Sequence, residues 1–172
     1  MKTSARQGFL IGCGEAEHAD ASAASMGSKA WNLLRMANTG LRVPPAFVLG
    51  TQWTDHPDTG IEHAFASGLP ALEQAVGRRL GNAADPLIVS VRSGAAVSMP
   101  GMMETLLNIG LSDRTLSGFL RQTGNPRLVW DAYRRLVASY GEVVAGLPAG
   151  LFEGELERMT QERDERSLDF SE

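Results

Sequence analysis

The sequence predicts an α+β fold, with a short mixed sheet and several packed helices, on three observations. Strand-like runs of apolar and β-branched residues occur along the chain, at residues 9–12, 46–50, 87–92 and 105–109. Between and after these runs, apolar residues recur at the three- and four-residue spacing of helices. The expected strands are also too few and too far apart for a doubly wound nucleotide-binding sheet.

Composition excludes several classes of protein. The 172 residues are 43% hydrophobic and 21% charged, which is typical of a globular chain that forms its own core. One cysteine and three histidines argue against a disulfide framework and against a metal site, and they fit a reducing cytoplasm. A net charge of −4 argues against nucleic-acid binding, and no run approaches the ~18 apolar residues of a membrane-spanning helix. We therefore expect a cytoplasmic protein with no nucleic-acid or membrane partner.

The first part of the chain alternates short strands with helices. Residues 9–12 are expected to form a strand, and the Ala-, Ser- and Gly-rich residues 15–28 a loop. Ser28 is placed to cap a helix over residues 29–38. Two consecutive prolines then impose an extended path, which leads into a buried strand at residues 46–50.

The remainder is mainly helical. Residues 61–67 and 70–80 are expected to be helices, the second ending at Gly81, and a further helix should end at Gly124. The longest helix should begin at Asn125-Pro126 and end near Gly146. Its apolar stripe predicts the buried face: Val129, Tyr133, Leu136, Val137, Tyr140, Val143 and Val144.

The last segment is one more amphipathic helix with a highly charged end. We divide the chain into a domain over residues 1–150 and a charged C-terminal helix over 151–172, which we expect to begin a further segment.

The strongest chemical signal is the arginine that ends the strand at residues 87–92. Alternation of side chains places Leu87, Val89 and Val91 on one face, which can pack in a core, and Arg92 on the other. The planar guanidinium fits phosphate oxygens, and backbone N–H groups of the following Ser-Gly turn can add donors. The alternative is a surface arginine at the end of a strand.

Three further features can be interpreted either as part of a functional site or as ordinary structure. Pro100-Gly101 fits a type II turn in a methionine-rich loop, which either covers a ligand or packs on the core. Lys29 lies at a helix start, where anions bind, but it can equally be an exposed lysine. Arg134 and Arg135 lie beside or opposite the apolar stripe of their helix, where a solvated face is the plain interpretation.

Taken together, these segments resemble one family. Gly27-Ser28-Lys29 and the segment 40–47 are similar to the opening of the ATP-grasp domain in pyruvate, phosphate dikinase and phosphoenolpyruvate synthase. The segment 90–95 resembles the next shared motif, and the segment 98–111 resembles the dikinase branch in particular. Residues 124–127 and 130–135 continue the resemblance in the same order. It covers residues 27–146 and implies the N-terminal portion of an ATP-grasp-like domain.

The resemblance implies a reaction and a set of site residues. Such a domain binds MgATP and passes a phosphoryl group to a histidine on a separate domain, from which it reaches pyruvate and forms phosphoenolpyruvate. By position, Lys29, Arg92 and Arg135 match the residues that hold the nucleotide phosphates, and Arg92 is the candidate catalytic residue. The loop near the transferred phosphate contributes Ser93, Gly94, Gly101 and Met103. Phosphoryl transfer depends on positioning and charge stabilisation, which such groups supply.

The departures from the family pattern limit this expectation. Ser28 and Ala30 stand where glycines are usual, and each adds a Cβ where backbone approaches phosphate. The ligands for Mg²⁺, the phosphohistidine domain and the pyruvate-binding domain are expected outside this chain. We therefore expect nucleotide binding without full turnover. A nucleotide-sensing or partner-binding module and a degenerate structural paralogue are the alternatives, and the expected partners are nucleotide, the remainder of a dikinase-like enzyme or a second copy.

Overall fold

The computed structural model describes residues 8–13, 20–93 and 105–169. Its strands form three separate pairs, where the sequence predicts one short mixed sheet. Two pairs are antiparallel, β1 (Gly8–Ile11) with β2 (Ala46–Leu49) and β5 (Val89–Arg92) with β6 (Thr105–Ile109), and β3 (Arg79–Leu80) with β4 (Pro86–Leu87) is parallel. The combination of these short strands with many helices agrees with the α+β class.

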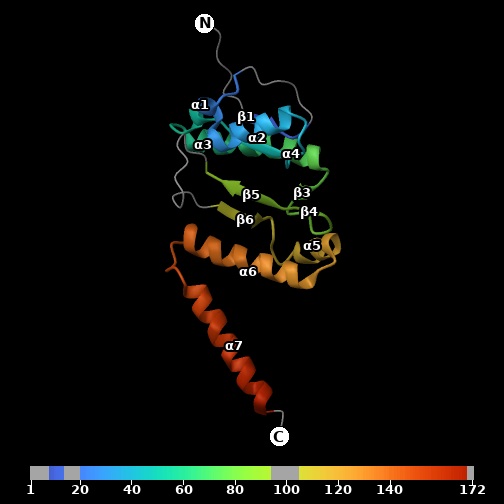
Figure 1. Ribbon diagram of the computed structural model, residues 1–172, viewed down its shortest axis with the longest axis vertical. Coiled ribbons are helices and arrows are strands. Elements are labelled where there is room, and N and C mark those ends of the chain that lie inside the picture. Colours follow the sequence, from blue (N-terminus) through green and yellow to red (C-terminus); the bar gives the residue numbers. More distant parts are fainter. Residues whose placement is uncertain (1–7, 14–19, 94–104, 170–172) are drawn as a thin grey trace.

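The N-terminal half forms the upper layer in Figure 1. Its helices are α1 (Ala23–Met26), α2 (Ser28–Asn38), the 3-10 helix Thr51–Trp53, α3 (Pro57–His63), the π-helix Ala64–Gly68 and α4 (Leu69–Val76). They pack with β1 and β2 around four buried side chains, Phe9, Ile11, Met26 and Leu34. This core joins β1 to Met26 of α1 and to Leu34 of α2.

Several expected boundaries in this half are wrong. The predicted loop contains α1, because Ser22 and Ser25 form a capping box that starts a one-turn helix. Ser28 is the first residue of α2, and its N-cap is Gly27. The helix predicted to reach residue 80 ends at Gly77, which takes the left-handed conformation with φ +74°, and β3 follows it.

The C-terminal half contains β5 and β6, α5 (Leu116–Thr123) and α6 (Pro126–Val143), around the buried residues Leu111, Leu116, Val129 and Leu136. Gly124 ends α5 in the left-handed conformation, and the Asn125 side chain accepts a hydrogen bond from the Leu128 N–H at the start of α6. Both of these helix boundaries confirm the prediction. The start of α5 is Leu116, just after the expected Ser112 or Asp113.

Two predicted buried faces are only partly correct. On α6, Val129 and Leu136 are buried, but the later stripe residues Val137, Tyr140, Val143 and Val144 are exposed. The short β6 and α5 pack against one face of α6, so the rest of the stripe is only partly covered. On β5, Val91 is 53% exposed. Instead, Ile88 packs against the core of this half.

A second long helix, α7 (Leu151–Asp169), extends away from the two layers (Figure 1). With 19 residues it exceeds the 18 of α6, which the sequence predicts to be the longest. Near its start, the Phe152 ring packs against Gly141 of α6, where an added Cβ would come within 2.6 Å of the ring. None of the described helices is long and apolar enough to cross a lipid bilayer.

Candidate phosphate-binding site

Arg92 is the last residue of β5, where it pairs with Thr105 at the start of β6. Its side chain is exposed, and no hydrogen bond or ion pair joins it to another residue that the structure describes. All five guanidinium N–H donors can therefore reach a ligand. Ser93 follows it and is also exposed. Gly94, Gly101 and Met103, the other residues expected in this loop, lie outside the described residues.

Arg135 lies in the middle of α6 and is held by an acidic neighbour. Its Nε lies 2.8 Å from one carboxylate oxygen of Asp131, and Nη2 of Arg134 lies 2.9 Å from the other. The hydrogen bond from Arg134 and the positive charges of both arginines lower the pKa of Asp131. The carboxylate is therefore ionised near neutral pH. The Arg135 side chain is nevertheless 63% exposed, so part of its guanidinium remains available.

A bulge in β6 determines where Arg135 lies along the β5–β6 hairpin. Between the pairs Val89–Ile109 and Val91–Leu106 the register shifts, and β6 carries one extra residue. Asn108, within this stretch, has φ +62°, and its side-chain amide donates a hydrogen bond of 3.1 Å to the Ala132 carbonyl of α6.

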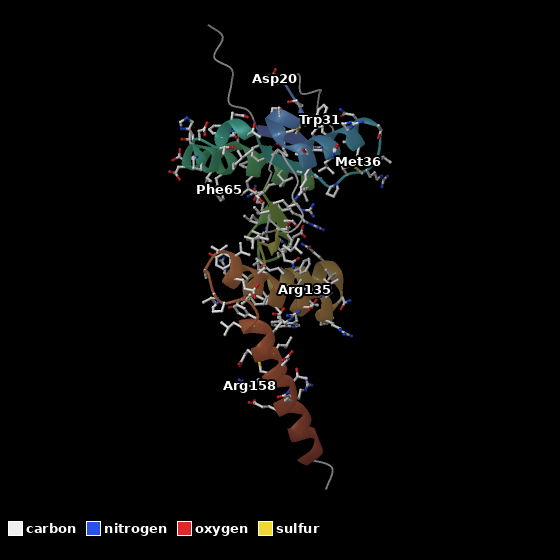
Figure 2. The ribbon with its side chains drawn as sticks, turned by 60° about the vertical axis from the view of Figure 1, so that its left-hand side comes forward. Asp20, Trp31, Met36, Phe65, Arg135 and Arg158 are labelled. Carbon is white, nitrogen blue, oxygen red and sulfur yellow. The ribbon has the colours of Figure 1, made fainter. Side chains whose placement is uncertain are left out.

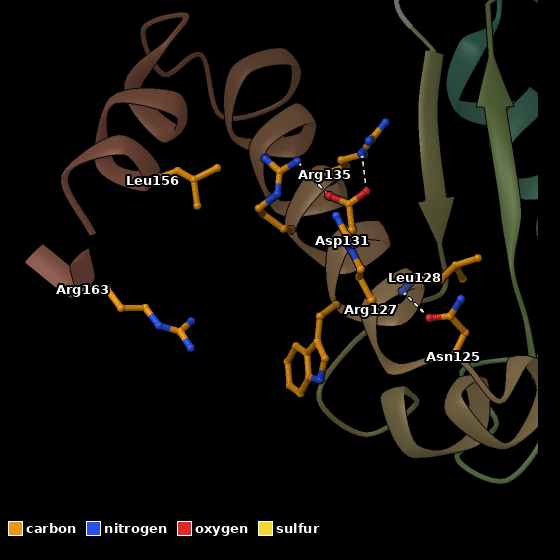
Figure 3. Close-up of a pocket in the computed structure, with 9 residues that line it drawn as sticks. Asn125, Arg127, Leu128, Asp131, Arg135, Leu156 and Arg163 are labelled. Carbon is orange, nitrogen blue, oxygen red and sulfur yellow. Dashed lines mark hydrogen bonds and ion pairs between the residues drawn. The ribbon is translucent and has the colours of Figure 1, made fainter. Parts of the chain in front are cut away.

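The hydrogen bond between Asn108 and Ala132 shows where Arg135 lies relative to the hairpin. Arg135 is three residues beyond Ala132, so it lies about one helical turn further along α6. β5 and α6 run in the same general direction in Figure 3, which also shows Arg135 extending from α6 on the side of the hairpin. From Ala132, Arg135 therefore lies further along α6 in the direction in which β5 runs toward Arg92, its last residue.

Lys29 belongs to the other half of the molecule. It is the second residue of α2, exposed, and it forms no ion pair with any carboxylate that the structure describes. In Figure 1, α1 and therefore the start of α2 lie toward the side to which β5 points. No described contact joins Lys29 to Arg92 or Arg135. The three cations therefore come from two packed units rather than from one cluster.

Figure 2 shows Arg135 in the lower half of the molecule and the labelled Trp31 and Met36 in the N-terminal layer.

The side chains of Lys29, Arg92 and Arg135 suit the oxygens of a phosphate chain better than they suit a metal ion. Within the described ranges, no three His, Cys, Asp or Glu side chains lie together as a metal-binding group. The arrangement can bind and orient an anion with two exposed guanidinium groups and one ammonium group.

Sequence reasoning missed two residues of this site. Asp131 has a recognisable signal, since a carboxylate three and four residues before two arginines pairs with them on a helix. The sequence signal at Asn108 is weaker: asparagine tolerates positive φ better than most residues do. Its bond to α6 depends on the tertiary fold and has no local signal.

Comparison with known proteins finds relatives over most of the chain. A chloroplastic pyruvate, phosphate dikinase of Oryza sativa subsp. japonica is 40% identical over 166 residues, which are 92% of this chain and 17% of the relative. The chain is homologous to a segment of the pyruvate, phosphate dikinases. The dikinase of Clostridium symbiosum is 39% identical over 80% of this chain, and that of Rhizobium meliloti (strain 1021) is 37% identical over 91%.

The match to these dikinases covers most of this chain but little of theirs. This chain spans 17% to 19% of the length of the three relatives. No protein-family profile matches the chain. The homology therefore identifies the family, and the activity of the whole relatives is not carried over to this chain.

Proposed function

We propose that this chain is an ATP-binding module of the dikinase type, the N-terminal portion of an ATP-grasp-like domain, which holds the nucleotide phosphates. The observation that carries this proposal is the position of Arg92, an exposed arginine at the end of β5 that forms no hydrogen bond or ion pair with another described residue, together with the partly exposed Arg135 on α6. Homology to dikinases at 37% to 40% identity supports the same reading.

Each side chain has a separate role in this proposal. Arg92 contacts the phosphate that is transferred and stabilises the charge that develops on it, with backbone N–H groups of Ser93 and Gly94 as further donors. Arg135 and Lys29 bind the other phosphates and fix their orientation. Gly101 and Met103 belong to the loop that lies near the transferred phosphate.

Mg²⁺ accompanies ATP in this proposal, and its charge offsets that of the phosphate oxygens. Within the described ranges no three His, Cys, Asp or Glu side chains lie together as a metal-binding group. On the resemblance to the dikinases, we place the acidic ligands of Mg²⁺ outside this chain. Formation of phosphoenolpyruvate also requires an acceptor histidine and a pyruvate site, which we place outside the chain. We expect nucleotide binding without complete turnover.

A second candidate function, a nucleotide-sensing or partner-binding module, is favoured by one observation. Large apolar side chains on α6 and α7 are exposed, Trp130 and Met159 among them, as on a surface that another polypeptide covers. A degenerate structural paralogue is the remaining alternative, and Ser28 and Ala30 are its basis.

Calorimetric titration with ATP, in the presence and absence of Mg²⁺, tests the proposal. We expect Arg92→Ala to weaken binding about tenfold or more, which corresponds to about 1.4 kcal/mol. Arg114→Ala is the matched control, because Arg114 is exposed and lies outside the predicted site, and it should leave the affinity unchanged.

Two results would contradict the proposal. Absence of binding at millimolar ATP would rule out the nucleotide-binding hypothesis and would favour the degenerate structural paralogue. Phosphoenolpyruvate formed by the isolated chain from pyruvate, ATP and phosphate would show that the expected lack of turnover is wrong.

A further inference from the structure

An open groove lies between α6 and α7. The described residues that line it come from the first half of α6 and, on α7, are Leu156 and Arg163. Figure 3 shows the side chains of Leu156 and Arg163 extending from α7 toward α6. A ligand in the groove therefore meets side chains of both helices.

On the α6 wall of this groove, an aromatic ring lies between two arginines. Trp130 follows Arg127 by three residues and precedes Arg134 by four, so the three side chains share one face of the helix. The Trp130 side chain is exposed, so its ring is open to a ligand. Arg135 borders the groove but lies about 100° further round α6 than Arg134, and it extends on the side of the hairpin.

The groove carries more positive charge than its own residues neutralise. Four arginines and one carboxylate line it, and this carboxylate, Asp131, is already paired with Arg134 and Arg135. Arg127 and Arg163 form no hydrogen bond or ion pair with another residue that the structure describes. Arg127 is also the second residue of α6, where the helix dipole disfavours a positive charge. A bound anion offsets both effects.

The acidic residues of α7 do not supply this anion. Glu155 and Glu162 both pair with Arg158 on their own helix. None of the glutamates that the structure describes on α7 lines the groove, which instead receives the exposed side chain of Leu156 from that helix. The groove therefore offers an external ligand both basic and apolar groups.

We propose that this groove binds a nucleoside phosphate, at a second site that is separate from the phosphate site of the proposed function. The flat base stacks on Trp130 and meets Leu156 on its other face, because an indole ring and a base both present π faces. The planar guanidinium groups of Arg127, Arg134 and Arg163 bind the phosphate oxygens. Only a ligand with both a ring and phosphates uses the apolar and the basic groups together.

Calorimetric titration of the full chain with ADP tests this site. The Arg92→Ala chain is used, because that substitution weakens the first phosphate site, and we expect ADP to bind to it at one site. Adding Arg127→Ala with Arg163→Ala should weaken this binding at least tenfold. The matched control, Arg35→Ala with Arg114→Ala, removes the same charge from exposed arginines elsewhere and should leave the affinity unchanged.

Trp130→Ala separates the contribution of the base from that of the phosphates. In the Arg92→Ala chain it should weaken ADP binding about tenfold and leave the affinity for inorganic pyrophosphate unchanged. Circular dichroism establishes that each variant remains folded.

Three results would overturn the proposal. They are absence of ADP binding at millimolar concentration in the Arg92→Ala chain, equal affinities of that chain for ADP and pyrophosphate, and a comparable loss in the control for Arg127 and Arg163. None of these measurements depends on the phosphate site that contains Arg92, so failure of the proposed function is distinguishable from failure of this second site.

Discussion

Asp131 controls how much of Arg135 is available to a ligand. The carboxylate binds Arg134 and Arg135 at the same time, and both guanidinium groups are exposed to solvent beyond this contact. Exposed ion pairs of this kind contribute little to stability, since water screens them and the side chains lose freedom. Their main effect is on position, because the pair holds Arg135 close to the surface of α6. Asp131 also adds a negative charge next to the proposed phosphate site.

The first prediction follows from this competition. Asp131→Asn removes the negative charge and leaves Arg135 free to turn toward phosphate, so ATP affinity should rise severalfold. Because the pKa of Asp131 is lowered, the carboxylate competes throughout the neutral range, and calorimetry at pH 7 measures the effect. The gain should vanish when Arg135→Ala is added to Asp131→Asn. An unchanged or weaker affinity in Asp131→Asn would mean that the ion pair orients Arg135 for binding.

At the scale of secondary-structure elements, Asn108 connects β6 to α6. The residue combines a left-handed backbone conformation with a hydrogen bond to the Ala132 carbonyl. Through this bond the bulge in β6 determines which turn of α6 faces the end of the hairpin. The distance between Arg92 on β5 and Arg135 on α6 therefore depends on Asn108, which lies on β6 between them.

Two substitutions at Asn108 separate these contributions. Asn108→Gly keeps the backbone conformation and loses only the hydrogen bond, which should cost about 1 kcal/mol of unfolding free energy. Asn108→Ala also imposes the left-handed conformation on a residue that disfavours it, and should cost about 2 kcal/mol. Urea unfolding measures both. Equal losses would contradict the role of the backbone conformation, and both variants should bind ATP more weakly if the bond positions Arg135.

The boundaries that the sequence predicts best are those with local causes. Asn125, Pro126 and Gly124 define the junction of α5 and α6 through capping and positive φ, and β6 has the predicted bounds, Thr105–Ile109. The separation of the strands into three pairs has no local cause, because pairing depends on contacts between distant segments. For the same reason the sequence overestimates the buried face of α6, whose cover depends on neighbouring elements.

The candidate site shows the same limit. Arg92 lies at the end of its strand, as predicted, but its exposure does not follow from alternation, because Val91 beside it is exposed as well. The roles of Lys29, Ser93 and Arg135 remain predictions, and those of Gly94, Gly101 and Met103 concern residues outside the described ranges. The structure adds the bond of Asn108 to α6, together with the pairing of Asp131, which has a local signal.

At the scale of the whole molecule, the two halves have separate cores. Phe9, Ile11, Met26 and Leu34 form one cluster, and Leu111, Leu116, Val129 and Leu136 the other. Every extensively packed pair of described elements lies within the half before β3 or within the half that begins with it. Lys29 belongs to one half, and Arg92 and Arg135 belong to the other. A nucleotide held by all three would therefore link two units that otherwise share little packing.

Hydrogen exchange with mass spectrometry tests this linkage. Phe9→Ala opens a cavity at a side chain that is only 2% exposed, and should cost about 3–5 kcal/mol of local stability. Without nucleotide we expect the loss of protection to be confined to β1, β2 and α2, while α5 and α6 keep theirs. Leu116→Ala should give the reverse pattern. Saturating ATP should raise protection in both halves of the wild type, since a ligand that contacts both stabilises both. Equal loss across both halves in Phe9→Ala, without ATP, would show that the chain unfolds as one cooperative unit and that nucleotide is not needed to link its halves.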